Sequence, residues 1–187
     1  MKNNQNIKTN LPEVSAWTVA KYLLSFDPER KYFSRDHLLI INEEEGYRSK
    51  TTIGNFRLNK MLQIIQALYF GCYEKTLFTD KMVAFENGGV IHSIYSNFMT
   101  LYEEPDYTLP FPLLVEKQRN FIEKVFSYLR DNYSDSELRD LAHEDIAWQK
   151  ARENRSYFDY NDEALEYYKA LSSSMLRAMG LIKELNC

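Results

Sequence analysis

The chain has 187 residues, 44% of them hydrophobic and 27% charged, and is long enough to bury a core within one domain. Its 23 basic and 27 acidic residues give a net charge of −4, which argues against a protein that coats nucleic acid. The N-terminus lacks the apolar segment of a signal peptide, and no apolar run approaches the ~20 residues that span a bilayer. These properties predict a cytoplasmic protein without a membrane partner.

Cysteine and aromatic usage narrow the class further. Cys72 and Cys187 lie far apart and form neither a metal motif nor a disulfide framework, so we expect reduced thiols in a reducing compartment. The chain has 14 Tyr and 11 Phe but only 6 Gly. We favour an aromatic core with Tyr at its margin, and a Tyr-rich contact surface is the alternative.

Residues 1–11 are polar and Asn-rich and predict a disordered tail. A first helix should start near Pro12 and end before Pro28, because the residue that precedes a proline is disfavoured in a helix. Residues 31–53 favour a small hairpin, with strands at 38–41 and 47–53. The three glutamates at 43–45 are predicted to lie in a solvated loop between them.

A long buried helix is predicted from Asn55, its expected N-cap, to about residue 73. Apolar residues recur there at the spacing of one helix face: Leu58, Met61, Leu62, Ile65, Leu68 and Tyr69. The polar exceptions on this helix are Lys60, Gln63 and Gln66.

A short strand or hairpin is predicted within 77–86, after which Gly88 and Gly89 are expected to open a second helix that includes Tyr95. Two glycines before a helix could present backbone amides to a phosphate. No Lys-Ser/Thr pair follows them, as a nucleotide-binding loop requires, so we favour a plain glycine turn.

The second half of the chain reads as further helices. A proline-marked loop at 103–112 precedes a helix over about 114–133, with Gln118 as its polar gap. Ser134 and Glu137 have the spacing of a capping box for a short helix that ends near His143. Helices at 147–152 and from 161 to about 182 follow. The prediction is a mostly α fold, a single compact domain over 12–187 with about six to seven helices and a minor β-hairpin component.

Candidate chemistry concentrates at His143, which adjoins two carboxylates, Glu144 and Asp145. Consecutive helical residues point in different directions, so an acid–base pair or metal site would need partners from elsewhere. We favour a helix-end histidine that either caps carbonyl groups or packs on Trp148. No catalytic motif is present, so the prediction is a protein that is not an enzyme and has no cofactor or metal. For the cationic residues 150, 152 and 155 we favour a solvated helix face over a contact with phosphate or with an acidic protein.

Several blocks of the sequence resemble one family. They are residues 19–24, then 57–62 with Gln66 and Tyr69, then 77–78, then 84–90 continuing to Tyr95, and finally His143 with 148–152. In order and spacing they resemble the Panacea family, the phage-associated SocA-like antitoxin domain. The chain departs from the family pattern where a proline is replaced by Gly89, another by His92, a tryptophan by Phe85 and a tyrosine by Gln63.

The resemblance implies a helical antitoxin that neutralises a toxin encoded by a neighbouring gene through direct protein binding. One alternative is a proteolytic adaptor with a protease as its second partner, because a member of the family delivers its toxin to a protease. A DNA-associated regulator of a mobile element is another, although the charge does not favour a nucleic-acid partner. An enzyme that uses His143 with distant carboxylates is the third. The residues that carry the family motif, and are therefore candidates for partner binding, are Lys60, Gln66, Gly88, Gly89, Tyr95, His143, Trp148 and Arg152.

Overall fold

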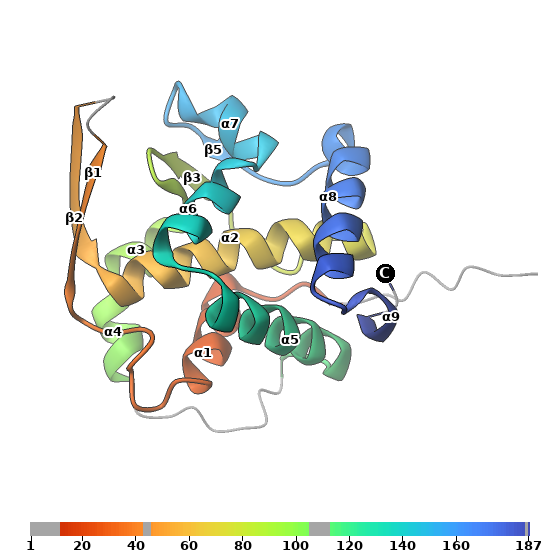
Figure 1. The fold of residues 1–187 in the computed structure, drawn as a ribbon, viewed down its shortest axis with the longest axis horizontal. Coiled ribbons are helices and arrows are strands. Elements are labelled where there is room, and N and C mark those ends of the chain that lie inside the picture. The colour runs from red at the N-terminus through yellow and green to blue at the C-terminus, as the bar shows by residue number, and fades with distance from the viewer. Residues whose placement is uncertain (1–11, 43–45, 105–112, 186) are drawn as a thin grey trace, which may run out of the picture.

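A computed structural model describes residues 12–42, 46–104, 113–185 and 187, and within them the chain is mostly helical, as predicted (Figure 1). The predicted tail at 1–11, the glutamates at 43–45 and most of the proline-marked loop lie outside the described residues. The helices are α1 (Ala16–Ser25), α2 (Ile53–Tyr73), α3 (His92–Ser96), α4 (Phe98–Glu103), α5 (Glu116–Asn132), α6 (Asp135–His143), α7 (Ile146–Arg152), η1 (Asp162–Ala164), α8 (Leu165–Ala178) and α9 (Ile182–Leu185). The strands are β1 (His37–Asn42), β2 (Tyr47–Thr52), β3 (Met82–Phe85), β4 (Gly88–Val90) and β5 (Tyr157–Phe158).

Helix α2 runs through the centre of the molecule, α5 packs against it, and α8 crosses its C-terminal half (Figure 1). From Gly54 to Gly71 every residue except Arg57 is buried, so the predicted burial on most sides is confirmed. The predicted N-cap was wrong. Thr52 caps the helix by accepting a hydrogen bond from the Asn55 backbone N–H, because strand β2 leads directly into the first turn.

Close approach between α2 and α8 depends on small residues at the crossing. A Cβ at Gly71 would overlap the carbonyl oxygen of Tyr168 and the hydroxyl of Ser172. The Ser172 hydroxyl donates to the Leu68 carbonyl across the crossing at 2.9 Å. A serine that weakens an isolated helix therefore serves here as the contact between two helices.

The strands form two separate antiparallel sheets. In the predicted hairpin, which is confirmed, β1 pairs with β2 so that Leu39 lies opposite Lys50 and Ile40 opposite Ser49. In the second sheet the order is β4-β3-β5, and β5 was not predicted because it has only two residues. Figure 1 shows β1 and β2 standing at one edge of the molecule, away from α8.

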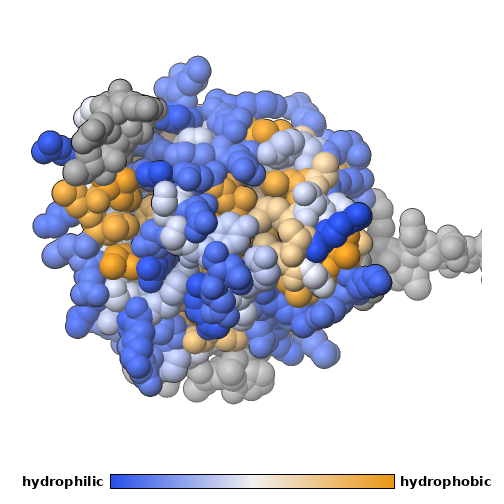
Figure 2. All heavy atoms as spheres, in the orientation of Figure 1, coloured by the Kyte–Doolittle hydropathy of each residue, from blue (hydrophilic) through white to orange (hydrophobic). Residues whose placement is uncertain are grey.

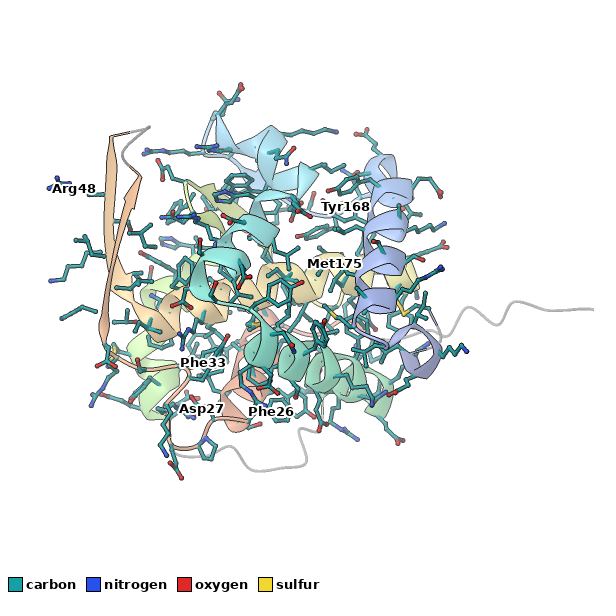
Figure 3. All side chains as sticks on the ribbon, viewed as in Figure 1. Phe26, Asp27, Phe33, Arg48, Tyr168 and Met175 are labelled. Atoms are coloured by element: carbon teal, nitrogen blue, oxygen red, sulfur yellow. A yellow bond between two sulfur atoms is a disulfide. The ribbon has the colours of Figure 1, made fainter. Side chains whose placement is uncertain are left out.

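Side chains alternate across the β1–β2 hairpin. Ile40, Ser49 and Thr51 line a cavity on its inner face, whereas Leu39 and Lys50 are exposed on the outer face. The surface drawn in Figure 2 is mostly hydrophilic, with separate apolar patches between the polar side chains. Arg48 points away from the body of the molecule (Figure 3). The hairpin thus has one face toward the body of the protein and one toward solvent.

Three predicted helix boundaries were wrong. The first helix starts at Ala16 after an N-cap at Ser15, because Val14 pairs instead with Phe78 in a parallel bridge. The helix predicted after the glycines is split at Asn97 into α3 and α4. The last helix breaks at Gly180, whose φ of +73° is left-handed. The predicted capping box of Ser134 and Glu137 is confirmed.

The prediction of separate thiols was also wrong, because Cys72 and Cys187 form a disulfide. Their Cα atoms lie 4.9 Å apart, and the bond joins the C-terminal half of α2 to the end of the chain. The two cysteines are 115 residues apart, so their spacing in the sequence does not indicate that they pair.

The tyrosines mainly serve the core. Tyr22, Tyr69, Tyr160 and Tyr168 are buried, and most of the other described ones pack against the core from its margin. The favoured interpretation of the aromatic content is therefore confirmed for these residues, and Tyr157 is the strongly exposed exception at 65%. In the described ranges, no helix combines the length and apolar character needed to cross a membrane.

Candidate functional site

Four amide side chains form a row on α2, at Asn55, Asn59, Gln63 and Gln66. Spacings of four, four and three residues place them on one face of the helix. All four are buried, so each must find hydrogen-bond partners within the protein. Those partners are mainly backbone groups of other segments, and this arrangement positions the site.

The first two amides hold the chain on either side of the start of α3. Asn55 Nδ2 donates to the Tyr95 carbonyl at 2.9 Å, and Asn59 Oδ1 accepts from the Ile91 N–H at 3.1 Å. Asn59 Nδ2 donates in turn to both oxygens of Asn55, at 2.9 and 3.0 Å. These contacts place Tyr95 beside α2.

Gln63 joins three segments. Its Oε1 accepts from the Gly89 N–H at 2.7 Å, while its Nε2 donates to the Ala142 carbonyl at 3.0 Å and to Asp145 Oδ2 at 3.1 Å. Strand β4 and the end of α6 are thereby held against the same side chain. Gln63, which stands where the family pattern has a tyrosine, thus forms hydrogen bonds through both its side-chain oxygen and its side-chain nitrogen.

Gln66 performs the same role for the segment before β3. It donates to the Phe78 carbonyl at 2.9 Å and accepts from the N–H groups of Leu77 and Phe78, at 2.9 and 3.3 Å. Gln66, a candidate for partner binding from sequence, therefore satisfies buried backbone groups and does not reach the surface.

The glycine pair has a different role from the one predicted. Gly88 and Gly89 lie in strand β4, and the helix begins only at His92. Gly88 has a φ of +111°, which side-chain-bearing residues rarely adopt, and a Cβ there would overlap the Lys60 amine. The strand therefore passes directly over the lysine side chain.

Lys60 is the one lysine among the described residues that is fully buried, at 2% exposure. Its Nζ has no hydrogen-bond partner in the described part of the chain. Burial lowers the pKa of this amine from 10.5 to about 7, because a low-dielectric environment disfavours the charged form. A buried, unpartnered amine is uncommon and is often found at functional sites.

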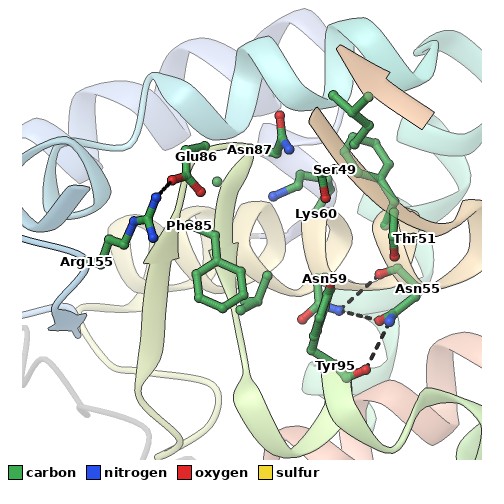
Figure 4. A pocket seen from close by; sticks show the side chains of 14 residues that line it. Ser49, Thr51, Asn55, Asn59, Lys60, Phe85, Glu86, Asn87, Tyr95 and Arg155 are labelled. Atoms are coloured by element: carbon green, nitrogen blue, oxygen red, sulfur yellow. Dashed lines mark hydrogen bonds and ion pairs between the residues drawn. The ribbon is translucent and has the colours of Figure 1, made fainter. Parts of the chain in front are cut away.

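A cavity of about 260 Å³ lies between the β1–β2 hairpin and the β3–β4 turn, with Lys60 in its wall (Figure 4). Glu86 and Arg155 form an ion pair at this cavity. The Phe85 ring packs on that of Tyr95 with centroids 5.8 Å apart. The residues that line the cavity are Ile40, Ser49, Thr51, Asn55, Phe56, Asn59, Lys60, Phe85, Glu86, Asn87, Gly88, Val90, Tyr95 and Arg155.

His143 lies at the end of α6 and stacks on Trp148, with the rings 4.3 Å apart and nearly parallel, as predicted. Burial and the nearby Lys60 charge lower the pKa of His143 to about 4, and its Nε2 is buried without a partner among the described residues. The Trp148 indole N–H donates to the Phe85 carbonyl at 2.8 Å, and Arg152 lies over the indole ring at 5.3 Å. Trp148 thus holds the end of β3 through its hydrogen bond to Phe85.

Asp145 is a buried carboxylate whose importance the sequence did not reveal. It accepts hydrogen bonds from the hydroxyls of Tyr160 and Tyr168, at 2.5 and 2.6 Å, and from the Ala147 N–H at 3.0 Å. Burial, followed by the Asp145 charge, raises the pKa of both tyrosines, so they remain hydrogen-bond donors. No spacing in the sequence links Asp145 to tyrosines 15 and 23 residues away.

The structure brings Lys60, Gly88 and Tyr95 together at the cavity, whereas His143, Trp148 and Arg152 contact one another outside its lining. Gln66 and Gly89 are buried structural contacts. The cationic residues 150, 152 and 155 do not form one patch, since Arg152 lies on Trp148 and Arg155 pairs with Glu86. The described residues contain no group of His, Cys, Asp and Glu that could hold a metal ion.

These features define a class: a mostly helical domain in which one buried helix anchors a small β-hairpin through a row of amides. Residues 58–149 match the model of the family described as antitoxin SocA-like, Panacea domain. The resemblance expected from the sequence is thereby confirmed over this segment, which includes most of α2, the β3–β4 hairpin and the first residues of α7. No curated protein and no solved structure matches the chain.

Proposed function

We propose that the protein is an antitoxin that neutralises a toxin encoded by a neighbouring gene by binding the toxin directly. The observation that carries the proposal is the match of residues 58–149 to the SocA-like antitoxin domain. The matched segment is mainly scaffold, because its helix α2 is buried and its polar side chains hold backbone groups. The toxin contact is therefore sought on the surface around this scaffold.

The outer face of the β1–β2 hairpin is the surface that best suits a protein partner. Leu39 is 60% exposed there, and Lys50 lies directly opposite it in the strand register. Arg48, two residues before Lys50, is also exposed and points outward (Figure 3). An exposed apolar side chain flanked by cations suits a partner surface that combines an apolar centre with acidic groups.

Co-expression with the adjacent open reading frame tests the proposal. We expect the neighbour alone to arrest growth and the wild-type protein to restore it, with both proteins recovered as one complex. A neighbour without toxicity, or toxicity that the wild-type protein does not relieve, contradicts the proposal.

A pair of variants then tests the surface. Leu39→Asp should abolish rescue and complex formation, because it places a charge at the centre of the proposed contact. Leu113→Asp is the matched control, since Leu113 is equally exposed at 62% but lies outside the hairpin. Equal rescue by the two variants would show that the toxin binds elsewhere.

The fate of the toxin separates sequestration from delivery to a protease. With sequestration, the toxin persists at a constant level in a complex. With delivery, its half-life falls when the antitoxin is present and recovers in a protease-deficient strain. We propose the cytoplasm as the site of action and a binding role without catalysis, in line with the antitoxin family.

A further inference from the structure

The cavity beside Lys60 has the composition of a ligand site. Its volume of about 260 Å³ lies just below the ~300–1,000 Å³ of typical small-molecule pockets. Phe56, Phe85 and Val90 give it an apolar wall, while Ser49 and Thr51 contribute hydroxyls from β2. Such pockets combine a mainly apolar lining with a few polar groups that fix the orientation of the ligand.

Lys60 provides the polar group that lacks a partner. Its side chain extends from α2 toward the turn that carries Glu86 and Asn87 (Figure 4). The neighbouring amides of Asn55 and Asn59 are already bound to each other and to backbone groups. The amine is thus the one buried side-chain donor of the pocket lining, within the described chain, that lacks an acceptor.

The other charged groups near the amine set the charge of a suitable ligand. Glu86 is at the cavity, paired with the exposed Arg155 on its solvent side, and His143 approaches from α6. Glu86 is already paired with Arg155, so a single amine is left to bind a ligand, and one cation suits a single negative charge better than a dianion. An organic ligand fits the pocket better than a bare inorganic ion, because an inorganic ion would make no contact with the apolar wall.

We propose that this pocket binds a small organic monocarboxylate, with the carboxylate on Lys60 Nζ and the apolar body against Phe56, Phe85 and Val90. Ammonium and carboxylate form a charge-assisted hydrogen bond, which satisfies the donor that the fold leaves unpaired. Asn87 lies on the same turn as Glu86 and also lines the pocket (Figure 4). This site does not depend on the toxin-binding proposal.

Titration of the isolated protein with benzoate tests the site, with benzamide as the uncharged analogue and inorganic phosphate as the dianion. Benzoate should shift the amide resonances of Phe85, Gly88 and Val90 in nuclear magnetic resonance spectra. It should bind at least about tenfold more tightly than benzamide or phosphate, which is the worth of one hydrogen bond to a charged group. Equal affinity for benzoate and benzamide, or no shift at these residues, would overturn the proposal.

Lys60→Met keeps the shape of the side chain and removes the amine. We expect this variant to lose at least about tenfold in benzoate affinity. Lys50→Met is the matched control, because Lys50 lies on the outer face of the β1–β2 hairpin and does not line the pocket, so its benzoate affinity should equal that of the wild type. Unchanged binding by a folded Lys60→Met protein contradicts the assignment.

Direct observation of the Lys60 amine in the wild-type protein makes the test independent of any variant. Bound benzoate should raise the pKa of the amine, since an adjacent anion favours the charged form. Affinity should therefore weaken by roughly tenfold for each pH unit above about 7, where the free amine loses its proton. An amine pKa that stays the same with and without benzoate refutes the contact.

Discussion

Replacement of Lys60 by methionine should stabilise the protein, although it removes a charged residue from the motif segment. The unfolded chain holds the Lys60 proton with a pKa of 10.5, whereas burial lowers the pKa to about 7 in the folded protein. Each pH unit of difference is worth ~1.4 kcal/mol, so the mismatch costs the fold on the order of 4 kcal/mol near neutral pH. Methionine has a similar shape and no proton to lose, and it should recover much of this free energy.

The sign and the pH range of the effect follow from linkage. Below about pH 7 both states bind the proton, so the penalty is constant. Between about 7 and 10.5 only the unfolded state binds it, so the stability of the wild type rises with pH by ~1.4 kcal/mol per unit. The advantage of Lys60→Met should therefore be largest at about pH 6 to 7 and shrink toward about pH 9.

Urea unfolding of the wild type, Lys60→Met and Lys50→Met at a series of pH values measures this directly. Lys50 is exposed, and its replacement should change the free energy of unfolding by less than ~0.5 kcal/mol at every pH. A Lys60→Met variant that is less stable than the wild type, or whose advantage is independent of pH, refutes the argument. Either result would mean that the amine has an anionic partner in the folded protein.

Three further predictions concern stability. Gly71→Ala should lower the free energy of unfolding by roughly 1–3 kcal/mol, because the new methyl group overlaps α8 and this outweighs a ~1 kcal/mol gain in helix propensity. Thermal unfolding followed by circular dichroism measures the change, and an increase in stability would contradict the close helix crossing. Reduction of the Cys72–Cys187 disulfide should lower the free energy of unfolding by up to about 5 kcal/mol, the limit set by chain entropy, and so lower the melting temperature in dithiothreitol. A Cys72→Ser variant should show no further response to the reductant. Asp145→Asn should lower the free energy of unfolding, measured with urea, by roughly 2–3 kcal/mol, because the new N–H₂ group would face the tyrosine hydroxyls that donate to the carboxylate in the wild type. An unchanged free energy of unfolding would mean that these hydroxyls find other acceptors.

Much of the scaffold could be predicted from local pattern. The apolar stripe of α2 indicated burial, and the spacing of Ser134 and Glu137 indicated the start of α6, because both signals act within a few residues. Lys60 was recognised as a polar exception on a buried helix. Whether its amine has a partner depends on the distant turn at Gly88, and local pattern carries no information about that.

The errors have the same origin. Gly88 and Gly89 were expected to open a helix, because two glycines in series commonly mark a turn, but pairing with β3 makes them a strand. Asn55 was expected to cap α2, yet its side chain is recruited by Tyr95, 40 residues away, and Thr52 serves as the cap. Long-range contacts override local preference at these positions.

The amide row on α2 has a consequence for how the two hairpins can vary. The amides bond particular backbone groups, so a shift of the β3–β4 segment by a single residue would leave several buried groups unsatisfied at once. The β1–β2 hairpin is secured to the body at its base, where Ile53 and Gly54 donate to the carbonyls of Asp36 and Ser34. Its outer strand positions are free to change sequence while the fold is kept. The register of the β3–β4 hairpin is therefore set by the core. The outer face of the β1–β2 hairpin can change in sequence and so acquire a new binding specificity.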